Sequence, residues 1–130
     1  MTKALVVDDS STVRSIITKM LASWGISAVQ AGSGREAYAS LENNADVDIA
    51  FVDWNMPVMN GIQLVQLIRS EEKYQGMKIV MVTTETEMPQ IIRALEEGVN
   101  EYIMKPFTKE IFQEKLALLG VLDVSESSNQ

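Results

Sequence analysis

Short apolar runs that end in a charged side chain recur along this chain, and they constrain its fold more than any other feature. Ile49–Val52 is entirely apolar and is followed by Asp53, and Ala4–Val7 is followed in the same way by Asp8 and Asp9. A strand with apolar side chains on both faces is typical of a parallel sheet that is covered by helices on both sides. Each run therefore predicts a buried strand that carries a carboxylate at its carboxyl end.

Segments with helical periodicity separate these runs. From Val13 to Trp24, apolar residues recur at intervals of three and four, and Gly25 ends the segment. The expected strands are Ala4–Val7, Ala28–Ala31, Ile49–Asp53, Lys78–Val82 and Glu101–Met104, and the expected helices begin near Thr12, Ser33, Gly61, Pro89 and Thr108. The apolar residues expected to face the core from the third and fourth helices are Ile62, Val65, Ile68, Ile91, Ile92 and Leu95. This alternation predicts a single doubly wound α/β domain with right-handed crossovers.

Length and composition limit the possible functions. The 130 residues suffice for one domain, which we expect over residues 1–122, with a polar tail or the start of a linker over residues 123–130. The net charge of −7 argues against nucleic-acid binding by this domain, and no apolar run is long enough to span a membrane. Without Cys or His, the chain has no disulfides, no His metal ligand and no phosphohistidine of its own, and we expect a cytoplasmic protein.

The residues whose side chains could take part in binding or catalysis lie at the carboxyl ends of the expected strands. They are Asp8, Asp9, Asp53, Thr83 and Lys105. In open α/β sheets, the functional crevice lies beyond this edge. Three carboxylates without His or Cys favour magnesium over zinc. A carboxylate can also act as a nucleophile and form an aspartyl phosphate, with a metal ion and the Lys105 ammonium offsetting the phosphoryl charge. The Thr83 hydroxyl could donate a hydrogen bond to that group.

These residues, in this order and with these separations, resemble the receiver domains of two-component response regulators over roughly residues 3–120. The resemblance rests on Asp8-Asp9, Asp53, Thr83 and Lys105-Pro106-Phe107. It implies that Asp53 is the phosphoryl acceptor and that Lys105 pairs with the phosphate. It implies a magnesium site formed by Asp8, Asp9, Asp53 and the backbone carbonyl of Asn55. It also implies that Thr83 and Tyr102 are the switch residues and that the peptide bond before Pro106 is cis.

The resemblance also implies a fold and partners. The fold is a (βα)5 flavodoxin-like domain with the strand order 2-1-3-4-5, and this order is adopted from the family. A monomeric receiver takes its phosphoryl group from a histidine kinase, releases it by autodephosphorylation, and binds an output protein through the face around Tyr102. Segments such as Asp53–Pro57 and Thr83–Glu85 look most like receivers that act in chemotaxis. There the partners would be the chemotaxis kinase and the flagellar motor switch.

Other functions remain open at this point. A phosphorelay shuttle, or the receiver domain of a larger regulator or hybrid kinase, would present nearly the same residues. An aspartyl-phosphate phosphatase needs a second acid two residues after the nucleophile, where this chain has Asn55. The acids disfavour a flavin or nucleotide carrier. Gly32–Ala37 matches a dinucleotide-binding pattern but follows the second strand, so we interpret it as a turn with a capping box. Taken alone, Asp8 and Asp9 could simply be helix-capping acids.

Overall fold

Five parallel strands form the centre of the computed structural model, which describes residues 2–122. The strands are β1 (Lys3–Val7), β2 (Ser27–Ala31), β3 (Ile49–Val52), β4 (Lys78–Thr83) and β5 (Glu101–Met104). They lie in the order β2-β1-β3-β4-β5, and each neighbouring pair is parallel. The α/β class and the strand order expected from the resemblance are thereby confirmed. The predicted tail over residues 123–130 lies outside the described residues.

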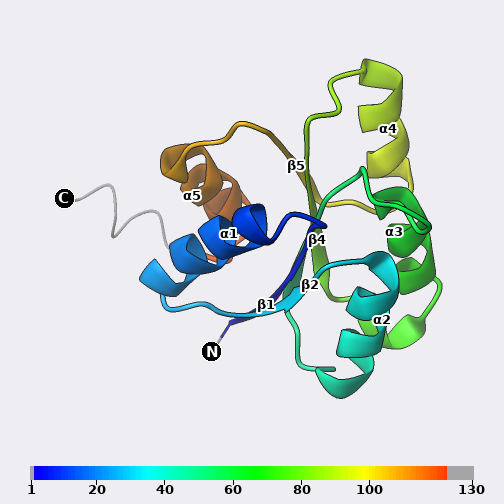
Figure 1. Ribbon diagram of the computed structural model, residues 1–130, viewed down its shortest axis with the longest axis horizontal. Coiled ribbons are helices and arrows are strands. Elements are labelled where there is room, and N and C mark those ends of the chain that lie inside the picture. Colours follow the sequence, from blue (N-terminus) through cyan, green and yellow to red (C-terminus); the bar gives the residue numbers. More distant parts are fainter. Residues whose placement is uncertain (1, 123–130) are drawn as a thin grey trace.

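Helices cover both faces of the sheet (Figure 1). They are α1 (Ser11–Ser23), α2 (Gly34–Asn43), α3 (Gly61–Arg69), α4 (Met88–Glu96) and α5 (Lys109–Leu118), and a short 3-10 helix, η1 (Glu72–Tyr74), precedes β4. Figure 1 shows α1 and α5 on one side of the sheet and the other three α-helices on the opposite side. Among residues 2–122, no helix combines the length and the apolar character that crossing a membrane would require.

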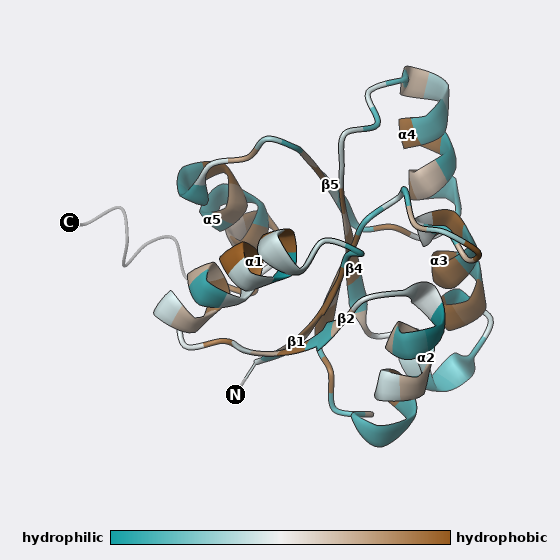
Figure 2. Cartoon of the chain, viewed as in Figure 1, coloured by the Kyte–Doolittle hydropathy of each residue, from teal (hydrophilic) through white to brown (hydrophobic). Residues whose placement is uncertain are grey.

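Each face of the sheet contributes to its own apolar core. Leu5 and Val7 of β1 belong to the cluster under α2 and α3, whereas Ala4 and Val6 belong to the cluster under α1 and α5. This alternation follows from the two-residue period of a strand, and it leaves the central strands β1, β3 and β4 apolar over most of their length (Figure 2), whereas the edge strands β2 and β5 also carry polar residues. Phe51 and Phe112 pack in the second cluster with their ring centroids 5.2 Å apart. The sheet is therefore a rigid base for the loops at its carboxyl edge.

Short polar side chains cap the starts of α1, α2, α3 and α5, whereas α4 has no side-chain cap. The Ser10 and Thr108 hydroxyls accept hydrogen bonds from the backbone N–H groups of Val13 and Ile111, at 3.2 Å and 3.1 Å. The Ser33 hydroxyl accepts one from Glu36 N–H at 3.1 Å, which is one of the two hydrogen bonds of the capping box predicted for Gly32–Ala37. A capping box with both hydrogen bonds is found for Asn60 and Gln63 at the start of α3. Because the three hydroxyl caps lie just beyond strand ends, they also limit the length of the loops that carry functional residues.

The predicted inward face of α4 was wrong at two positions. The Ile92 and Leu95 side chains are 49% and 48% exposed, whereas Ala94 is buried and Ile91 is partly buried. The reason lies in the position of the helix, because α4 lies toward the edge of the sheet formed by β5 (Figure 1). A helix at an edge contacts the sheet through a narrower stripe than a helix over the centre does. The remaining apolar side chains of α4 are left at the surface.

Candidate functional site

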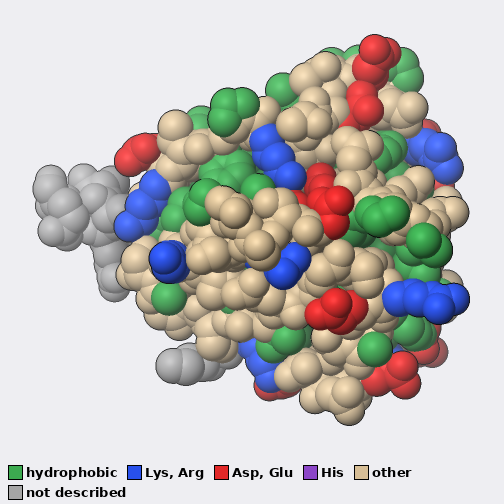
Figure 3. Space-filling view, viewed as in Figure 1, with side chains coloured by type: hydrophobic (Ala, Val, Ile, Leu, Met, Phe, Trp, Pro, Cys, Tyr) green, Lys and Arg blue, Asp and Glu red, His purple; other side chains and the backbone are tan. Residues whose placement is uncertain are grey.

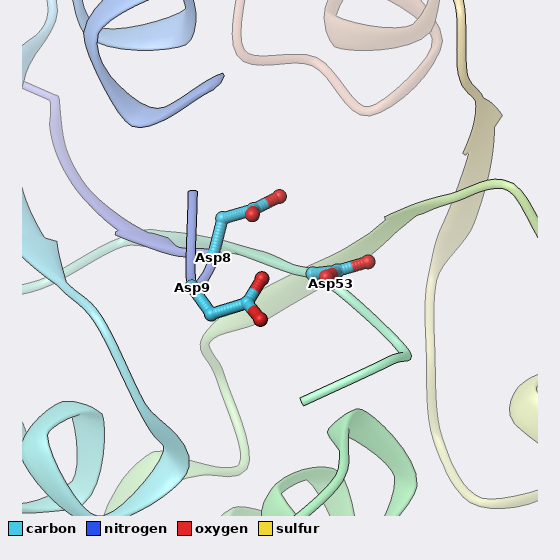
Figure 4. A group of neighbouring side chains, drawn as sticks. All are labelled: Asp8, Asp9 and Asp53. Carbon is cyan, nitrogen blue, oxygen red and sulfur yellow. The ribbon is translucent and has the colours of Figure 1, made fainter. Parts of the chain in front are cut away.

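Three carboxylates converge at the carboxyl edge of the sheet, from the ends of β1 and β3 (Figure 4). Asp8, Asp9 and Asp53 each place one carboxylate oxygen so that these oxygens all lie within 4.8 Å of one another. Asp8 and Asp53 are 2% and 5% exposed, whereas Asp9 is exposed. The convergence follows from the register, because Val7 pairs with Val52 and the next residue of each strand end is an acid. The sequence prediction that these acids meet at one edge is confirmed.

The backbone around Asp53 is held from several sides. Asp53 N–H donates to the Val7 carbonyl at 2.9 Å, which continues the pairing of β1 and β3 by one residue. Its carboxylate accepts a hydrogen bond from the backbone N–H of Asn55. Gly61 N–H donates to the Trp54 carbonyl at 2.9 Å, so the start of α3 lies directly against this turn. The predicted acceptor is therefore placed by backbone contacts on both sides of it.

Lys105 reaches the acids from the carboxyl end of the edge strand β5. Its Nζ lies 2.7 Å from Asp8 Oδ2 and 3.4 Å from Asp53 Oδ1, and its backbone N–H donates to the Thr83 carbonyl at 2.9 Å. The Lys105–Pro106 peptide bond is cis, as the resemblance implied. Burial by itself lowers the pKa of the Lys105 ammonium, but the hydrogen bond from this group to Asp8 and the charge of Asp53 outweigh it and raise the pKa. Lys105 thus remains a cation inside the site.

The Asp53 carboxyl is poised to accept additional positive charge. Burial and, after it, the charge of Asp8 raise the pKa of Asp53, and the contacts with Lys105 and Asn55 only partly oppose this rise. The balance shows that the Lys105 ammonium does not fully offset the effects of burial and of the Asp8 charge on Asp53. Figure 3 shows acidic side chains gathered near the centre of this face with basic side chains around them. A divalent cation at this place would relieve the remaining repulsion.

The donor set at this edge fits magnesium. All three side chains offer oxygen, which suits a hard divalent cation, and the exposed Asp9 leaves one side open to water and to a phosphoryl group. Lys105 already contacts Asp8 and Asp53. Asn55 has an exposed side chain. The metal-binding role of its backbone carbonyl stays a prediction.

Thr83 and Tyr102 are joined through one residue of the β4–α4 loop. Thr83 is fully buried at the end of β4, and its hydroxyl accepts a hydrogen bond from Glu85 N–H at 3.2 Å. The Tyr102 hydroxyl donates to the backbone carbonyl of the same Glu85. Burial, with a smaller contribution from the charge of Glu85, raises the pKa of Tyr102 to about 12, so this hydroxyl remains a donor at neutral pH. A movement of Thr83 would therefore be felt at Tyr102 through Glu85.

Sequence reasoning missed two residues that shape this site, Arg14 and Gly61. The Arg14 guanidinium donates to the backbone carbonyl of Asp8 at 2.6 Å. A Cβ built on Gly61 would lie 2.9 Å from Trp54 Cα and 3.1 Å from the Asp53 carbonyl carbon. The sequence indicates no role for Arg14, and it places Gly61 only at the start of a helix. No pattern of neighbouring residues indicates either role, because the backbone that each residue contacts comes close to it only when the chain folds.

Comparisons with known proteins agree with this geometry. Residues 4–117 match the model of the family described as response regulator receiver domain. The chemotaxis protein CheY homolog of Campylobacter jejuni is 51% identical over 115 residues, which cover 88% of each chain. Chemotaxis protein CheY1 of Helicobacter pylori is 47% identical over 93% of this chain and 99% of that protein. The solved structure of Vibrio cholerae chemotaxis protein CheY4 is similar with a TM-score of 0.84 at 34% identity, over 94% of this chain and 99% of that chain.

Proposed function

We propose a function for this chain on the premise that it belongs to the family of response regulator receiver domains, as its match over residues 4–117 and its relatives at 51% and 47% identity establish. It is a phosphorylation-dependent signalling switch that accepts a phosphoryl group on Asp53 from a histidine kinase in the cytoplasm. The convergence of Asp8, Asp9 and Asp53 with the Lys105 ammonium at one sheet edge carries this proposal.

The chemistry is a transfer between two nucleophiles. An Asp53 carboxylate oxygen attacks the phosphorus, an oxygen–phosphorus bond forms, and the bond from phosphorus to the imidazole nitrogen of the donor breaks. Lys105, which lies 3.4 Å from Asp53, pairs with a phosphoryl oxygen. Magnesium held by Asp8, Asp9, Asp53 and the Asn55 carbonyl would neutralise the negative charge that develops on the phosphoryl oxygens. Attack by water in line with the anhydride bond later returns the carboxylate and releases phosphate.

The Thr83–Glu85–Tyr102 chain carries the signal to the surface. A phosphoryl group on Asp53 offers the Thr83 hydroxyl a charged acceptor, and Thr83 turns toward it and gives up the hydrogen bond from Glu85 N–H. Glu85 then moves, and its carbonyl no longer holds the Tyr102 hydroxyl in its present place. The Tyr102 ring turns inward and changes the face formed by α4, β5 and α5. The element with two states is the β4–α4 loop.

The output surface is apolar around Tyr102. Its exposed apolar side chains are Met88, Ile92 and Leu95 of α4, Met104 of β5 and Ile111 of α5. Exposed apolar groups that gather on neighbouring elements are typical of protein-binding surfaces. The relatives named as chemotaxis proteins support a flagellar motor switch protein as the output partner and a chemotaxis kinase as the phosphodonor. Ile92 and Leu95, which were wrongly expected in the core, therefore belong to the proposed surface for binding the output protein.

The output surface is tested by two matched substitutions. Ile92 and Ile16 are 49% and 48% exposed, but Ile16 lies on α1, which is not one of the elements that form the proposed output surface. We expect Ile92→Ser to weaken binding of the beryllofluoride-treated protein to a purified flagellar motor switch protein by roughly tenfold, as for a central interface residue. Ile16→Ser should leave the dissociation constant unchanged. Equal effects of both substitutions would contradict the assignment of the surface.

The switch itself is tested by incubation with acetyl phosphate. With magnesium, we expect intact-mass spectrometry to show a single added phosphoryl group, and with excess chelator none, because the three carboxylates then repel the donor. The adduct should disappear over time as water attacks the anhydride. Absence of an adduct in magnesium would contradict the switch. Multiple turnover of varied phosphate esters would instead support the phosphatase class.

A further inference from the structure

Arg14 contacts the loop that carries two of the three carboxylates. It lies in the first turn of α1, and its Nη1 donates to the backbone carbonyl of Asp8 at 2.6 Å. Its Nε donates to Gln30 Oε1 at 3.2 Å, and Gln30 belongs to β2. A planar guanidinium held at two of its nitrogens has a fixed direction. The side chain therefore ties the β1–α1 loop to the neighbouring strand.

Room for this side chain is made by Gly32. A Cβ at Gly32 would lie 3.3 Å from Arg14 Nη1, which is closer than most Cβ contacts in proteins. The first glycine of the segment Gly32–Ala37 thus has a role that its resemblance to a nucleotide-binding pattern did not suggest. It leaves space for the guanidinium behind Asp8.

The Asp8 carbonyl has a direct geometric link to Asp9. The peptide unit is planar, so the carbonyl oxygen of Asp8 and the N–H and Cα of Asp9 share one plane. Asp8 is already held at its backbone N–H by the Ala31 carbonyl at 3.1 Å, and at its carboxylate by Ser10 N–H at 2.9 Å and Lys105 Nζ at 2.7 Å. By fixing the carbonyl, Arg14 fixes the plane from which the exposed Asp9 side chain leaves the chain.

We propose that Arg14 is a positioning residue of the magnesium site, which aims Asp9 at the oxygens of Asp8 and Asp53 through the Asp8 carbonyl. This inference rests on the proposed function, because it concerns the site proposed there to hold magnesium. A positioning role and a simple charge effect predict opposite results. A cation near the site repels magnesium, so loss of the charge alone would tighten binding, whereas loss of the positioning contact weakens it.

The test is calorimetric titration of the metal-free protein with magnesium chloride. We expect Arg14→Gln to raise the dissociation constant roughly tenfold, the lower end of the loss found for outer partners of metal sites. Arg14→Lys keeps the charge but lacks the second donor, and it should also weaken binding. Gln30→Ala, which changes no charge, should weaken it by a smaller factor. The control is Lys19→Gln, which removes a cation from an exposed position of the same helix and should not weaken binding.

The outcomes separate this inference from the proposed function. If the parent protein takes up no magnesium, the proposed function itself is wrong. If the parent binds magnesium and Arg14→Gln binds as tightly or more tightly, the positioning role is wrong and the function stands. Circular dichroism of each variant shows whether the fold is retained. If Arg14→Gln does not fold, the magnesium affinity of the charge-neutral Gln30→Ala is compared with that of the parent instead. An unchanged affinity of Gln30→Ala then overturns the inference.

Discussion

Asp53→Asn is expected to abolish the phosphoryl adduct completely, because the amide oxygen cannot form the anhydride that a carboxylate forms. Asp8 and Asp9 each place a carboxylate oxygen within 4.8 Å of an Asp53 oxygen. The Asp8 carboxylate, however, is already held by Lys105 Nζ at 2.7 Å and Ser10 N–H at 2.9 Å, and Asp9 is exposed. We therefore expect no transfer of the reaction to a neighbouring acid. Intact-mass spectrometry after incubation with acetyl phosphate and magnesium measures the loss directly.

A control substitution at another acid shows whether the adduct is lost because the acceptor is missing or only because one negative charge is removed. Glu42→Gln removes one negative charge at an exposed position of α2, and it should leave the adduct unchanged. Without divalent ions, Asp53→Asn should unfold at a temperature no lower than the parent does, since burial and the charge of Asp8 already disfavour the ionised carboxylate there. An adduct of normal yield on Asp53→Asn would refute the assignment of the acceptor.

The part of the fold that the sequence predicted is the part built on local periodicity. The apolar run Ile49–Val52 predicted a buried strand, and once the strand order places β3 beside β1, the register of the pair brings Asp53 to Asp8. The acids, Thr83 and Lys105 were found from the sequence because a parallel sheet gathers the ends of its strands. The strand order and the cis bond before Pro106 came only from the family resemblance. No residue pattern in the chain specifies either of them.

The remaining features depend on contacts between segments that are distant in the sequence. The periodicity of α4 gave no indication that this helix lies toward an edge, so Ile92 and Leu95 were placed in the core. Val58 has a φ of 69°, which a β-branched residue rarely adopts, and no local signal announces it. Arg14 contacts the backbone carbonyl of Asp8. Every residue has such a carbonyl, so the sequence does not indicate which one an arginine will contact. Such contacts can be inferred only once the fold is known.

Gly61→Ala is expected to destabilise the protein although helix propensity predicts the opposite. Gly61 is the first residue of α3 and does not have a left-handed backbone conformation, so alanine would ordinarily gain up to about 1 kcal/mol. The added Cβ, however, would meet the Asp53 carbonyl oxygen and would lie 2.9 Å from Trp54 Cα. These atoms belong to backbone, which cannot rotate away as a side chain can. We expect a net loss of about 3 kcal/mol, measured by urea unfolding.

Gly76→Ala is the control for this prediction, because a Cβ there would have no atom within 4 Å and its backbone is likewise not left-handed. Both substitutions reduce the entropy of the unfolded chain to a similar extent, so their difference isolates the contact with the Asp53 turn. Gly76→Ala should leave the free energy of unfolding unchanged or raise it slightly. Because the clash moves the backbone that carries Asp53, Gly61→Ala should also weaken magnesium binding, whereas Gly76→Ala should not. Equal stability of the two variants would mean that α3 can shift away from the strand end, and that Gly61 does not fix the position of Asp53, the proposed phosphoryl acceptor.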